Sequence, residues 1–465
     1  MNRNKVLLAL GLICSLAAGS YGQGASEDAI TQIVAKAGSA LARLEYVYHN
    51  EIVGAQTRIG QCVCIDAANG VFLTRDVSGA VPADELRDFF LIPSGSTEKK
   101  FKAELMGTDP EENLTFLRVA GKHPWKDLKF VRADLKLGQQ VIGVGLLGPQ
   151  TGNVPYAGIA RVAAKLRMPG EVIYVSGGDL TNASSPVFAS DGRMVGIVSQ
   201  QIPMEFRMLL RDRWTEIGLA GLQSTRFFLP VAEFAHVLGR IPQKGKARRL
   251  VWMGVWRYKL VAAEEAEIKK LPAGKPAVLI EQLRSGGPAD KANVKQGDAI
   301  IGLNGKPLPE LPTPALVATN FRRLLYRFMA GDRISLTLFR EGRTFEAQVT
   351  LEPMPLQPHE AARYYDRVLG IACRDLVDFD RYPGRVSALT TRGVLATLVL
   401  PNLPAAAGNM QPGDIITHVG DKPISDVETL GKVLKELSAA TEPVQFLVKR
   451  GEQDRQMLMI TLPPR

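Results

Sequence analysis

The chain has 465 residues, of which 46% are hydrophobic and 22% charged, and its formal net charge is +10. This composition is typical of a folded globular protein and excludes a disordered, collagen-like or multi-span membrane chain. At roughly 150 residues per domain, the length predicts about three domains. The 44 glycines and 29 prolines indicate many turns and a β-rich architecture. The five histidines and four cysteines leave few candidates for acid–base or metal chemistry.

The N-terminus is predicted to be a signal peptide over residues 1–22, which places the mature chain in the periplasm or outside the cell. Arg3 and Lys5 give a positively charged start, and residues 6–18 form an apolar stretch. Small residues at positions 20 and 22 suit cleavage before Gln23. No later apolar stretch reaches the ~18 residues of a membrane-spanning helix, so no membrane span is predicted.

The cysteines and the basic residues indicate no cofactor, no metal and no nucleic-acid partner. Cys62 and Cys64 flank Val63 in a strand-like run, where side chains two apart share a face but stand too far apart for a relaxed disulfide. With Cys373 remote in sequence, two thiols make a poor metal site, and buried structural cysteines are predicted. The basic segment 244–249 fits either an anionic or nucleic-acid contact or a solvated linker, and export favours the linker.

The strongest organisational feature is an internal repeat in the C-terminal half. In each copy an aspartate of a Gly-Asp pair follows a proline by ten residues, and a second proline follows the first by nineteen: Pro288, Asp298 and Pro307, then Pro404, Asp414 and Pro423. Each copy is predicted to hold a short Pro-started helix, a strand, a tight turn, a longer helix and a closing β-hairpin. The hairpins are expected around 340–342 and 450–452, and 425–428 is predicted to be a capping box that opens the second long helix.

These motifs resemble the PDZ domains of the bacterial HtrA (DegP-type) family. The pattern Gly-Pro-Ala-x-x-Ala-x-Val-x-x-Gly-Asp-x-Ile, which is specific for that class, is present at 287–300. The resemblance implies a first PDZ domain over 250–354 and a second over 364–465. PDZ domains bind extended peptide C-termini by adding a strand to a sheet edge.

The resemblance also implies where the peptide would bind. In PDZ domains, backbone N–H groups of an apolar-Gly-apolar loop before the first strand hold the terminal carboxylate. Here the loops are Trp252, Met253, Gly254 and Val255 in the first copy, and Val368, Leu369, Gly370 and Ile371 in the second. Three prolines near the first copy's long helix raise the alternative that the first groove is altered or closed: Pro309, Pro312 and Pro314.

The segment 30–242 consists of short apolar runs separated by turns, which predicts an all-β barrel or sandwich. The runs are 62–65, 71–73, 141–144, 172–175 and 194–198. Beside two PDZ-like copies, this segment resembles the trypsin-like protease domain of HtrA. The local matches lie at 70–74, 107–114, 137–145 and 182–197. The fold class that follows is mainly β: a trypsin-like double β-barrel followed by two α+β PDZ domains.

The triad positions of the family are replaced in this chain. Serine-protease catalysis needs a hydroxyl nucleophile, an imidazole and an orienting carboxylate. Where the family has these groups, the chain has Val77 for the His, Asn113 for the Asp and Ala183 for the Ser. Serines 184 and 185 stand where the family has two glycines that shape the nucleophile loop, which argues against a preformed oxyanion site. The resemblance therefore predicts a degenerate triad, no catalytic residue and a pseudoprotease.

A relocated nucleophile is the alternative. Ser184 or Ser185 could attack a substrate if an imidazole stood within hydrogen-bond reach of its hydroxyl. Histidines 49, 123 and 236 belong to this region, but none lies where the family's fold would place a general base. The alternative function is thus a serine endoprotease with a relocated nucleophile.

The expected function is that of an exported, non-catalytic HtrA-like protein. Its PDZ domains would bind peptide C-termini or extended segments of unfolded exported proteins, as a scaffold, adaptor or regulator in envelope protein quality control. The family resemblance further implies a homotrimer or an association with an active relative. Holding unfolded clients as a chaperone is a weaker possibility.

Overall fold

The structure is a computed structural model that describes residues 25–50, 54–77, 83–199, 207–210, 213–216, 226–243, 245–261, 271, 275–381, 392–437, 442–451 and 455–462. The predicted signal peptide and Lys244 of the basic segment lie outside the described residues. The chain packs as two compact units. The first draws on the described residues within 25–46, 59–77 and 88–246, and the second on those within 47–58, 83–87 and 247–462.

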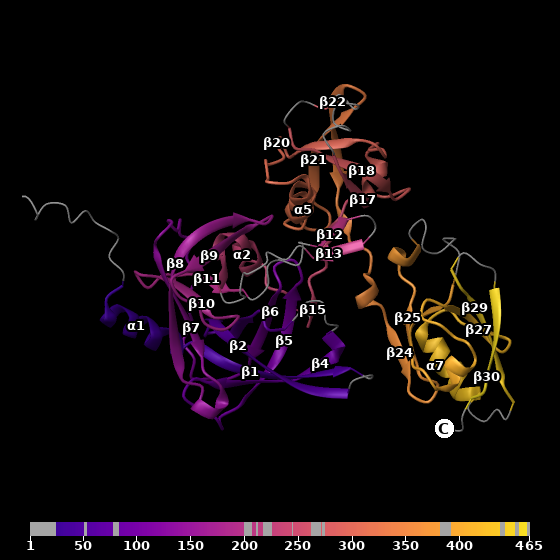
Figure 1. The fold of residues 1–465 in the computed structure, drawn as a ribbon, viewed down its shortest axis with the longest axis horizontal. Coiled ribbons are helices and arrows are strands. Elements are labelled where there is room, and N and C mark those ends of the chain that lie inside the picture. Colours follow the sequence, from indigo (N-terminus) through magenta and orange to yellow (C-terminus); the bar gives the residue numbers. More distant parts are fainter. Residues whose placement is uncertain are drawn as a thin grey trace, which may run out of the picture. The chain divides into compact units, whose positions relative to one another are not determined.

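Two closed barrels make up most of the first unit's described strands (Figure 1). The first has the order β5-β4-β1-β2-β3-β6, and β6 pairs back to β5. Its strands are β1 (Leu41–Asn50), β2 (Gly54–Asp66), β3 (Val71–Thr74), β4 (Leu86–Pro93), β5 (Phe101–Asp109) and β6 (Leu114–Val119). The second has the order β10-β11-β14-β9-β8-β7. Its strands are β7 (Gln140–Leu146), β8 (Pro155–Arg167), β9 (Glu171–Ser176), β10 (Pro186–Ala189), β11 (Met194–Val198) and β14 (Phe227–Pro230).

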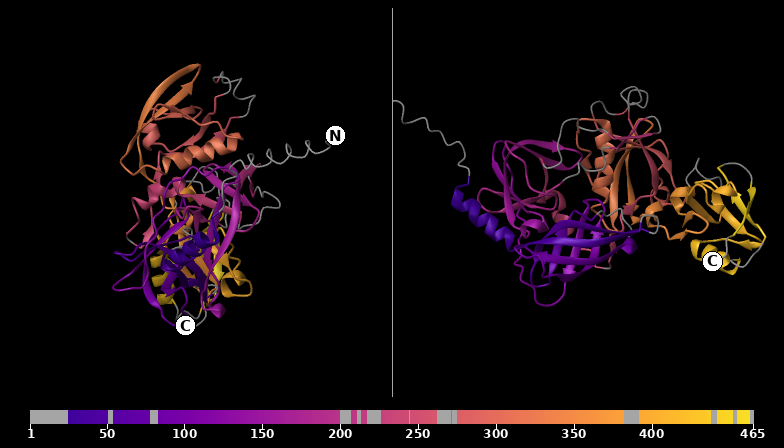
Figure 2. Two further views of the ribbon diagram at one scale, coloured as in Figure 1. Left: turned by 90° about the vertical axis from the view of Figure 1, so that its left-hand side faces the viewer. Right: turned by 60° about the horizontal axis from the view of Figure 1, so that its bottom comes forward.

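Inward-facing apolar side chains fill the second barrel. Valines 141, 162, 175, 187 and 195 belong to one buried cluster together with Phe228. Along β8 the buried residues alternate with exposed ones, as expected for a strand with one face on the core. The remaining described elements of this part are α1 (Glu27–Gly38), η1 (Ala83–Glu85), η2 (Pro149–Thr151), β12 (Arg207–Leu210), β13 (Arg213–Glu216), α2 (Val231–Leu238) and β15 (Lys246–Ala247). Figure 2 shows the barrels from two further sides.

The first repeat is a five-stranded antiparallel path, β17-β18-β19-β21-β22, with the small strand β20 on β19. Its strands are β16 (Val251–Trp252), β17 (Val255–Leu260), β18 (Val278–Leu283), β19 (Ala299–Leu303), β20 (Lys306–Pro307), β21 (Arg333–Arg340), β22 (Arg343–Thr350) and β23 (Glu352–Pro353). The helices are α4 (Pro288–Lys291) and α5 (Pro314–Leu325). Glu341 and Gly342 have positive φ and form the predicted hairpin turn between β21 and β22.

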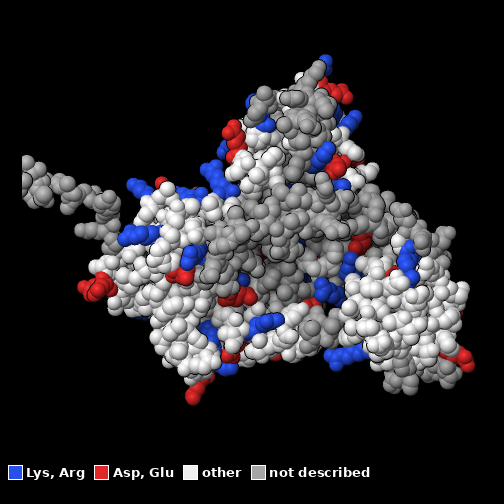
Figure 3. All heavy atoms as spheres, in the orientation of Figure 1, with Lys and Arg blue, Asp and Glu red and all other residues white. Residues whose placement is uncertain are grey.

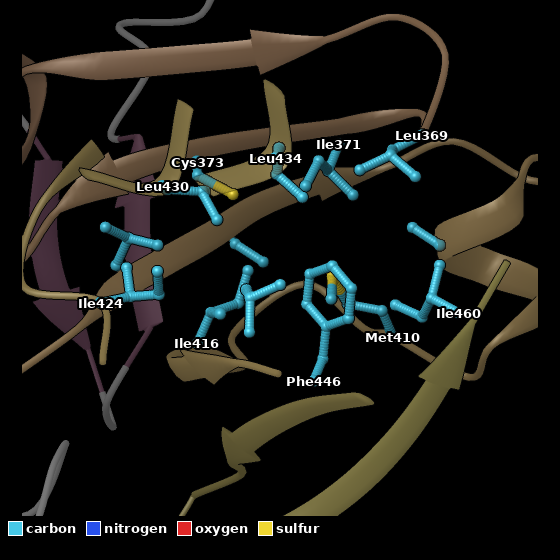
Figure 4. Close-up of a cluster of buried hydrophobic side chains, with 14 of the residues drawn as sticks. Leu369, Ile371, Cys373, Met410, Ile416, Ile424, Leu430, Leu434, Phe446 and Ile460 are labelled. Atoms are coloured by element: carbon cyan, nitrogen blue, oxygen red, sulfur yellow. The ribbon is translucent and has the colours of Figure 1, made fainter. Parts of the chain in front are cut away.

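The second repeat has the same plan with one difference at its edge. Its path is β24-β25-β26-β27-β29-β30, with β28 on β27. The strands are β24 (Arg363–Asp366), β25 (Ile371–Asp375), β26 (Val394–Val399), β27 (Ile415–Val419), β28 (Lys422–Pro423), β29 (Val444–Lys449) and β30 (Arg455–Ile460). The helices are η5 (Pro358–Glu360), η6 (Asp378–Arg381), α6 (Pro404–Ala407) and α7 (Val427–Glu436). Figure 4 shows Leu430 and Leu434 of α7 beside Cys373 and Ile371 of β25 in the core.

The repeated Gly-Asp pair is explained by a buried ion pair that recurs in both copies. Asp298, 1% exposed, accepts from the backbone N–H of Lys295 and pairs with Arg340 at 2.6 Å. Asp414, fully buried, accepts from the N–H of residue 411 and pairs with Arg450 at 2.7 Å. Each arginine also donates to a carbonyl of the preceding loop, which satisfies the buried charge. In each copy the Gly-Asp aspartate therefore links the loop after the short helix to the closing hairpin.

Two local predictions need correction or refinement. The N-cap of α7 is Asp426 and not Ser425, because the Asp426 carboxylate accepts from Thr429 N at 2.8 Å. Pro309 and Pro312 precede α5, and Pro314 is its first residue, where the missing N–H costs nothing. The prolines therefore leave α5 a regular helix capped by the side chain of Thr313.

Acidic and basic side chains are interspersed over the face shown in Figure 3. Among the described residues, no helix combines the length and the apolar character that a membrane crossing requires.

Candidate functional site

The positions that resemble the triad lie around the end of β3. Val77 follows β3 and is buried, and its carbonyl oxygen accepts a 3.0 Å hydrogen bond from Thr115 Oγ1 of β6. Asn113 stands directly before β6 with a φ of 50°. Ala183 is buried in the loop that leads to β10. The fold therefore places Val77 beside the start of β6, directly after Asn113.

Ser184 ties the loop of Ala183 to the end of β3. Its hydroxyl oxygen accepts from the backbone N–H of Arg75 at 2.8 Å and lies 3.2 Å from Thr74 Oγ1. Its own N–H donates to the carbonyl of Val198 at 3.1 Å. Ser184 is fully buried and has a φ of 64°, a conformation that favours the glycine of the family pattern. The Ser184 side chain thus occupies the space between the nucleophile loop and β3.

Gln61 of β2 bridges the two barrels through the same region. Its Nε2 donates to Ser185 Oγ at 2.6 Å, and its Oε1 accepts from the N–H of Leu146 on β7 at 3.1 Å. Thr74 Oγ1 donates to the Gln61 carbonyl at 2.8 Å. Gln61 is 3% exposed and Ser185 fully buried. Both hydroxyls thus belong to a buried polar network at the centre of the site.

Asp76 adds a buried carboxyl to this network. Its Oδ2 accepts from the backbone N–H of Gln61 at 2.8 Å. Gly60 permits this approach, because a Cβ there would lie 2.6 Å from the Asp76 side chain. Burial raises the pKa of the Asp76 carboxyl to about 6, although hydrogen bonds from Gln61 and Ser184 and the charge of Arg75 oppose the shift.

We expect the buried carboxyl to make the stability of the barrels depend on pH. Its pKa is about 3.9 in an unfolded chain, so its contribution to folding is complete below about pH 4 and is lost as the pH rises through 6. The free energy of unfolding of Asp76→Asn should therefore exceed that of wild type by on the order of 2 kcal/mol at pH 7.5. This difference should shrink toward zero as the pH falls to 4. Calorimetry across this range measures it, with the exposed Asp134→Asn as control. Parallel stability curves for wild type and Asp76→Asn would contradict the assignment.

The described hydrogen bonds of Ser184 and Ser185 include none to a histidine. His123 packs its ring against Phe72 and Trp125, with centroids 6.1 and 5.7 Å apart. His49 lies on β1 and His236 on α2. The site thus offers the serines no imidazole partner among the described residues.

The thiols and acids show no metal-binding arrangement in the described part of the chain. Cys62, Cys64 and Cys373 are buried and unpaired with one another. Burial raises the pKa of the Cys64 and Cys373 thiols to about 12, which keeps them protonated at neutral pH. No group of three or more His, Cys, Asp or Glu side chains that could hold a metal is found among the described residues.

The first repeat holds its predicted peptide loop between β16 and β17. Gly254 has a φ of 86°, and a Cβ there would lie 2.9 Å from Cδ of Pro288 at the start of α4. The Met253 carbonyl accepts from the N–H of Ala289, and the Gly254 carbonyl from that of Arg284, both at 2.8 Å. These bonds fix the carbonyls of the loop on the side of α4. Glycine is required here for both conformation and space.

The second repeat holds the corresponding loop between β24 and β25, and Asp366 binds it. Asp366 Oδ1 accepts from the backbone N–H groups of Val368 and Leu369 at 3.1 and 3.0 Å. The N–H of Gly370 donates to the Asp366 carbonyl at 2.8 Å. Sequence analysis missed Asp366. The signal was an acidic residue four positions before the loop glycine, where the first copy has Leu250.

Comparisons with known proteins bear on both halves of the chain. The family model for the PDZ domain matches residues 261–351 and 368–460. A relative from Pseudomonas fluorescens named "Probable periplasmic serine endoprotease DegP-like" is 26% identical over 368 residues, which cover 76% of this chain and 70% of the relative. A protein of the same name from Ectopseudomonas mendocina is 27% identical over 406 residues, which cover 83% and 77%.

A solved structure extends the likeness to the fold. The "HtrA-type protease AlgW with tripeptide" matches 70% of this chain and 98% of its own length, with a TM-score of 0.52 and 18% identity. Fold and comparisons first define a class of protein by its architecture: a trypsin-like pair of β-barrels with PDZ domains. Over about three quarters of its length the chain is also similar in sequence to DegP-like proteins. The relatives' names agree with the exported location predicted from the sequence.

Proposed function

We propose that this chain is an exported, non-catalytic HtrA/DegP-type protein that captures peptide C-termini or extended segments of other exported proteins through PDZ domains. The domain bounds are those predicted from the sequence: 30–242 for the barrels, 250–354 and 364–465 for the PDZ domains. The compartment is the periplasm, as in the names of the relatives. In this role the barrels serve as a scaffold, and the chain acts as adaptor or regulator in envelope protein quality control, as a homotrimer or beside an active relative.

The observation that carries the proposal is the buried Ser184 hydroxyl. Acyl transfer needs an exposed nucleophile, a base within hydrogen-bond reach and an open oxyanion site. Here the Ser184 oxygen is already bonded to the end of β3, and Ala183 has no hydroxyl to offer. Val77 and Asn113 supply neither imidazole nor carboxylate. These features favour a filled, inert site over a resting catalytic one.

The alternative is a serine endoprotease that uses Ser184 or Ser185. The names of the relatives favour it, since both are named "Probable periplasmic serine endoprotease DegP-like". It requires the attacking serine to leave its present partner, Arg75 for Ser184 or Gln61 for Ser185, and to become exposed. For Ser184 the carboxyl within reach as a base is Asp76, which accepts its hydrogen bond.

Casein hydrolysis separates the two functions. We expect the purified mature chain to leave fluorescein-labelled casein uncut and to remain unlabelled by a fluorophosphonate probe, with an active DegP-like relative as positive control. Cleavage that disappears in Ser184→Ala or Ser185→Ala would establish the protease. Cleavage that both variants retain would indicate a contaminating enzyme.

A further inference from the structure

The two repeats differ at the place where a PDZ domain takes up its peptide. We infer that the second PDZ domain carries its own ligand: strand β24 occupies the peptide groove, and the Asp366 carboxylate takes the place of a peptide's terminal carboxylate. The inference rests on the proposed peptide-binding function, which it assigns to the first domain for external partners.

Strand β24 adds to the edge of β25 as a bound peptide would. The two strands are antiparallel, with Arg363 opposite Arg374 and Asp366 opposite Ile371. A further bond joins the N–H of Asp375 to the carbonyl of residue 362 at 2.9 Å. β24 therefore runs toward the loop, and its C-terminal residue lies where β25 begins. A PDZ ligand adds a strand to a sheet edge in this way, with its C-terminus at the loop.

Asp366 fills the anion site of the loop. Consecutive backbone N–H groups make a concave site for a negative group. In the second copy the N–H groups of Val368 and Leu369 converge on one oxygen of Asp366, and that of Gly370 on its backbone carbonyl. Asp366 is 4% exposed. An incoming carboxylate would have to displace a buried carboxylate that is already bonded.

Tyr364 closes the groove against the helix. Its ring packs on the hydrophobic core of the second repeat. On α7, Gly431 leaves room for it, because a Cβ there would lie 3.0 Å from Tyr364 Cε2. The Tyr364 hydroxyl lies 3.2 Å from the second oxygen of Asp366. The ring of Tyr364, two residues before Asp366, thus fills the space beside α7.

The first repeat does not fold back in this manner. The strand before its loop, β16, pairs with β23, and the N–H of Met354 donates to the Leu250 carbonyl at 2.8 Å. Among the described residues, β17 has β18 as its strand neighbour and stands at the end of its sheet. Tyr258 of β17 meets Phe321 of α5 with ring centroids 5.7 Å apart, so the edge strand and the long helix are neighbours here, as β25 and α7 are in the second repeat.

Tethering makes the internal ligand a strong competitor. A segment joined by a short turn acts at an effective concentration of order 1 mM or more, so an internal segment of ~10 μM intrinsic affinity for the groove weakens the binding of any external peptide there on the order of 100-fold. Peptides should therefore enter the first domain at concentrations that leave the second closed. Release of β24 would expose a second groove for a peptide with a free carboxylate.

Hydrogen exchange read by mass spectrometry tests the inference in the full mature chain. The probe is a pool of decapeptides with four randomised C-terminal residues and a free carboxylate, and the amidated pool is the control. In wild type we expect the pool to slow exchange in β17 and to leave 367–375 unchanged. In Asp366→Ala we expect 371–375 to exchange at least tenfold faster without peptide, and the pool to slow it again. Asp332→Ala, which removes a similar backbone bond to Met329 in the first repeat, should behave as wild type.

The outcomes separate this inference from the proposed function. Pool-dependent protection of 367–375 in wild type would overturn the self-ligand. No gain of protection in Asp366→Ala, with α7 still slow to exchange, would overturn it as well. If α7 also exchanges fast in Asp366→Ala, the milder variant Asp366→Asn is used in its place. We then expect the same faster exchange of 371–375 and the same slowing by the peptide pool, both smaller in size. Absence of protection in β17 together with gain in Asp366→Ala would reject external binding by the first domain and leave the self-ligand standing.

Discussion

Gln61→Ala is expected to lower the free energy of unfolding of the barrels by about 3 kcal/mol while leaving the chain as inert toward casein as before. The substitution leaves two buried groups without a hydrogen-bond partner. These are the Ser185 hydroxyl and the N–H of Leu146, which bond to the Gln61 side-chain amide at 2.6 and 3.1 Å. Each unsatisfied buried group costs about 1–3 kcal/mol. Denaturant unfolding with circular dichroism measures the loss.

Gln61→Met is the matched control, because it restores most of the side-chain volume and none of the hydrogen bonds. We expect Gln61→Met to recover less than half of the loss, since burial of unpaired polar groups and not the cavity dominates. Full recovery by methionine would show that packing alone holds the site. A variant as stable as wild type would contradict the role given to Gln61.

Gly254→Ala is expected to weaken binding of C-terminal peptides at least tenfold. The new Cβ would lie 2.9 Å from Cδ of Pro288, and the φ of 86° is unfavourable for alanine. The loop must then shift, and its N–H groups no longer converge on a carboxylate. Fluorescence anisotropy with the free-carboxylate peptide pool measures the change.

Gly305→Ala provides the control in the same domain. Gly305 also has a positive φ, of 71°, but nothing lies within 4 Å of its Cβ position. We expect a small loss of stability and peptide affinity within twofold of wild type. Equal loss of binding in both variants would mean that general strain and not the loop geometry is responsible.

The repeat was predictable from sequence because its signals are local. A proline that opens a short helix, or a pair of turn residues, determines the structure of only a few neighbouring positions. Because these residues recur at the same spacing in both copies, the two copies predict the same fold. The Gly-Asp pair was visible as a pattern, but its reason, the buried pairs of Asp298 and Asp414 with arginines of the closing hairpin, depends on contacts about 40 residues apart. The cap of α7 was misplaced by one residue because Ser425 and Asp426 are both good caps.

The candidate site was only partly predictable. The family resemblance assigned the triad positions to Val77, Asn113 and Ala183, but it gave no indication of which side chains fill the space around them. Gln61 lies 124 residues from its partner Ser185 in the sequence, and no local sequence pattern predicts that hydrogen bond. Asp366 was missed for a different reason: resemblance directed attention to the apolar-Gly-apolar loop, while the residue that binds the loop lies just before it.

Mass spectrometry of peptides recovered from the protein tests the central claim, capture without cleavage, most directly. The mature chain is incubated with the free-carboxylate decapeptide pool, and bound and unbound peptides are then sequenced. The account predicts enrichment of full-length peptides in the bound fraction, loss of enrichment for the amidated pool, and no fragments in either fraction. Fragments that accumulate with time in wild type and not in Ser184→Ala or Ser185→Ala would contradict it.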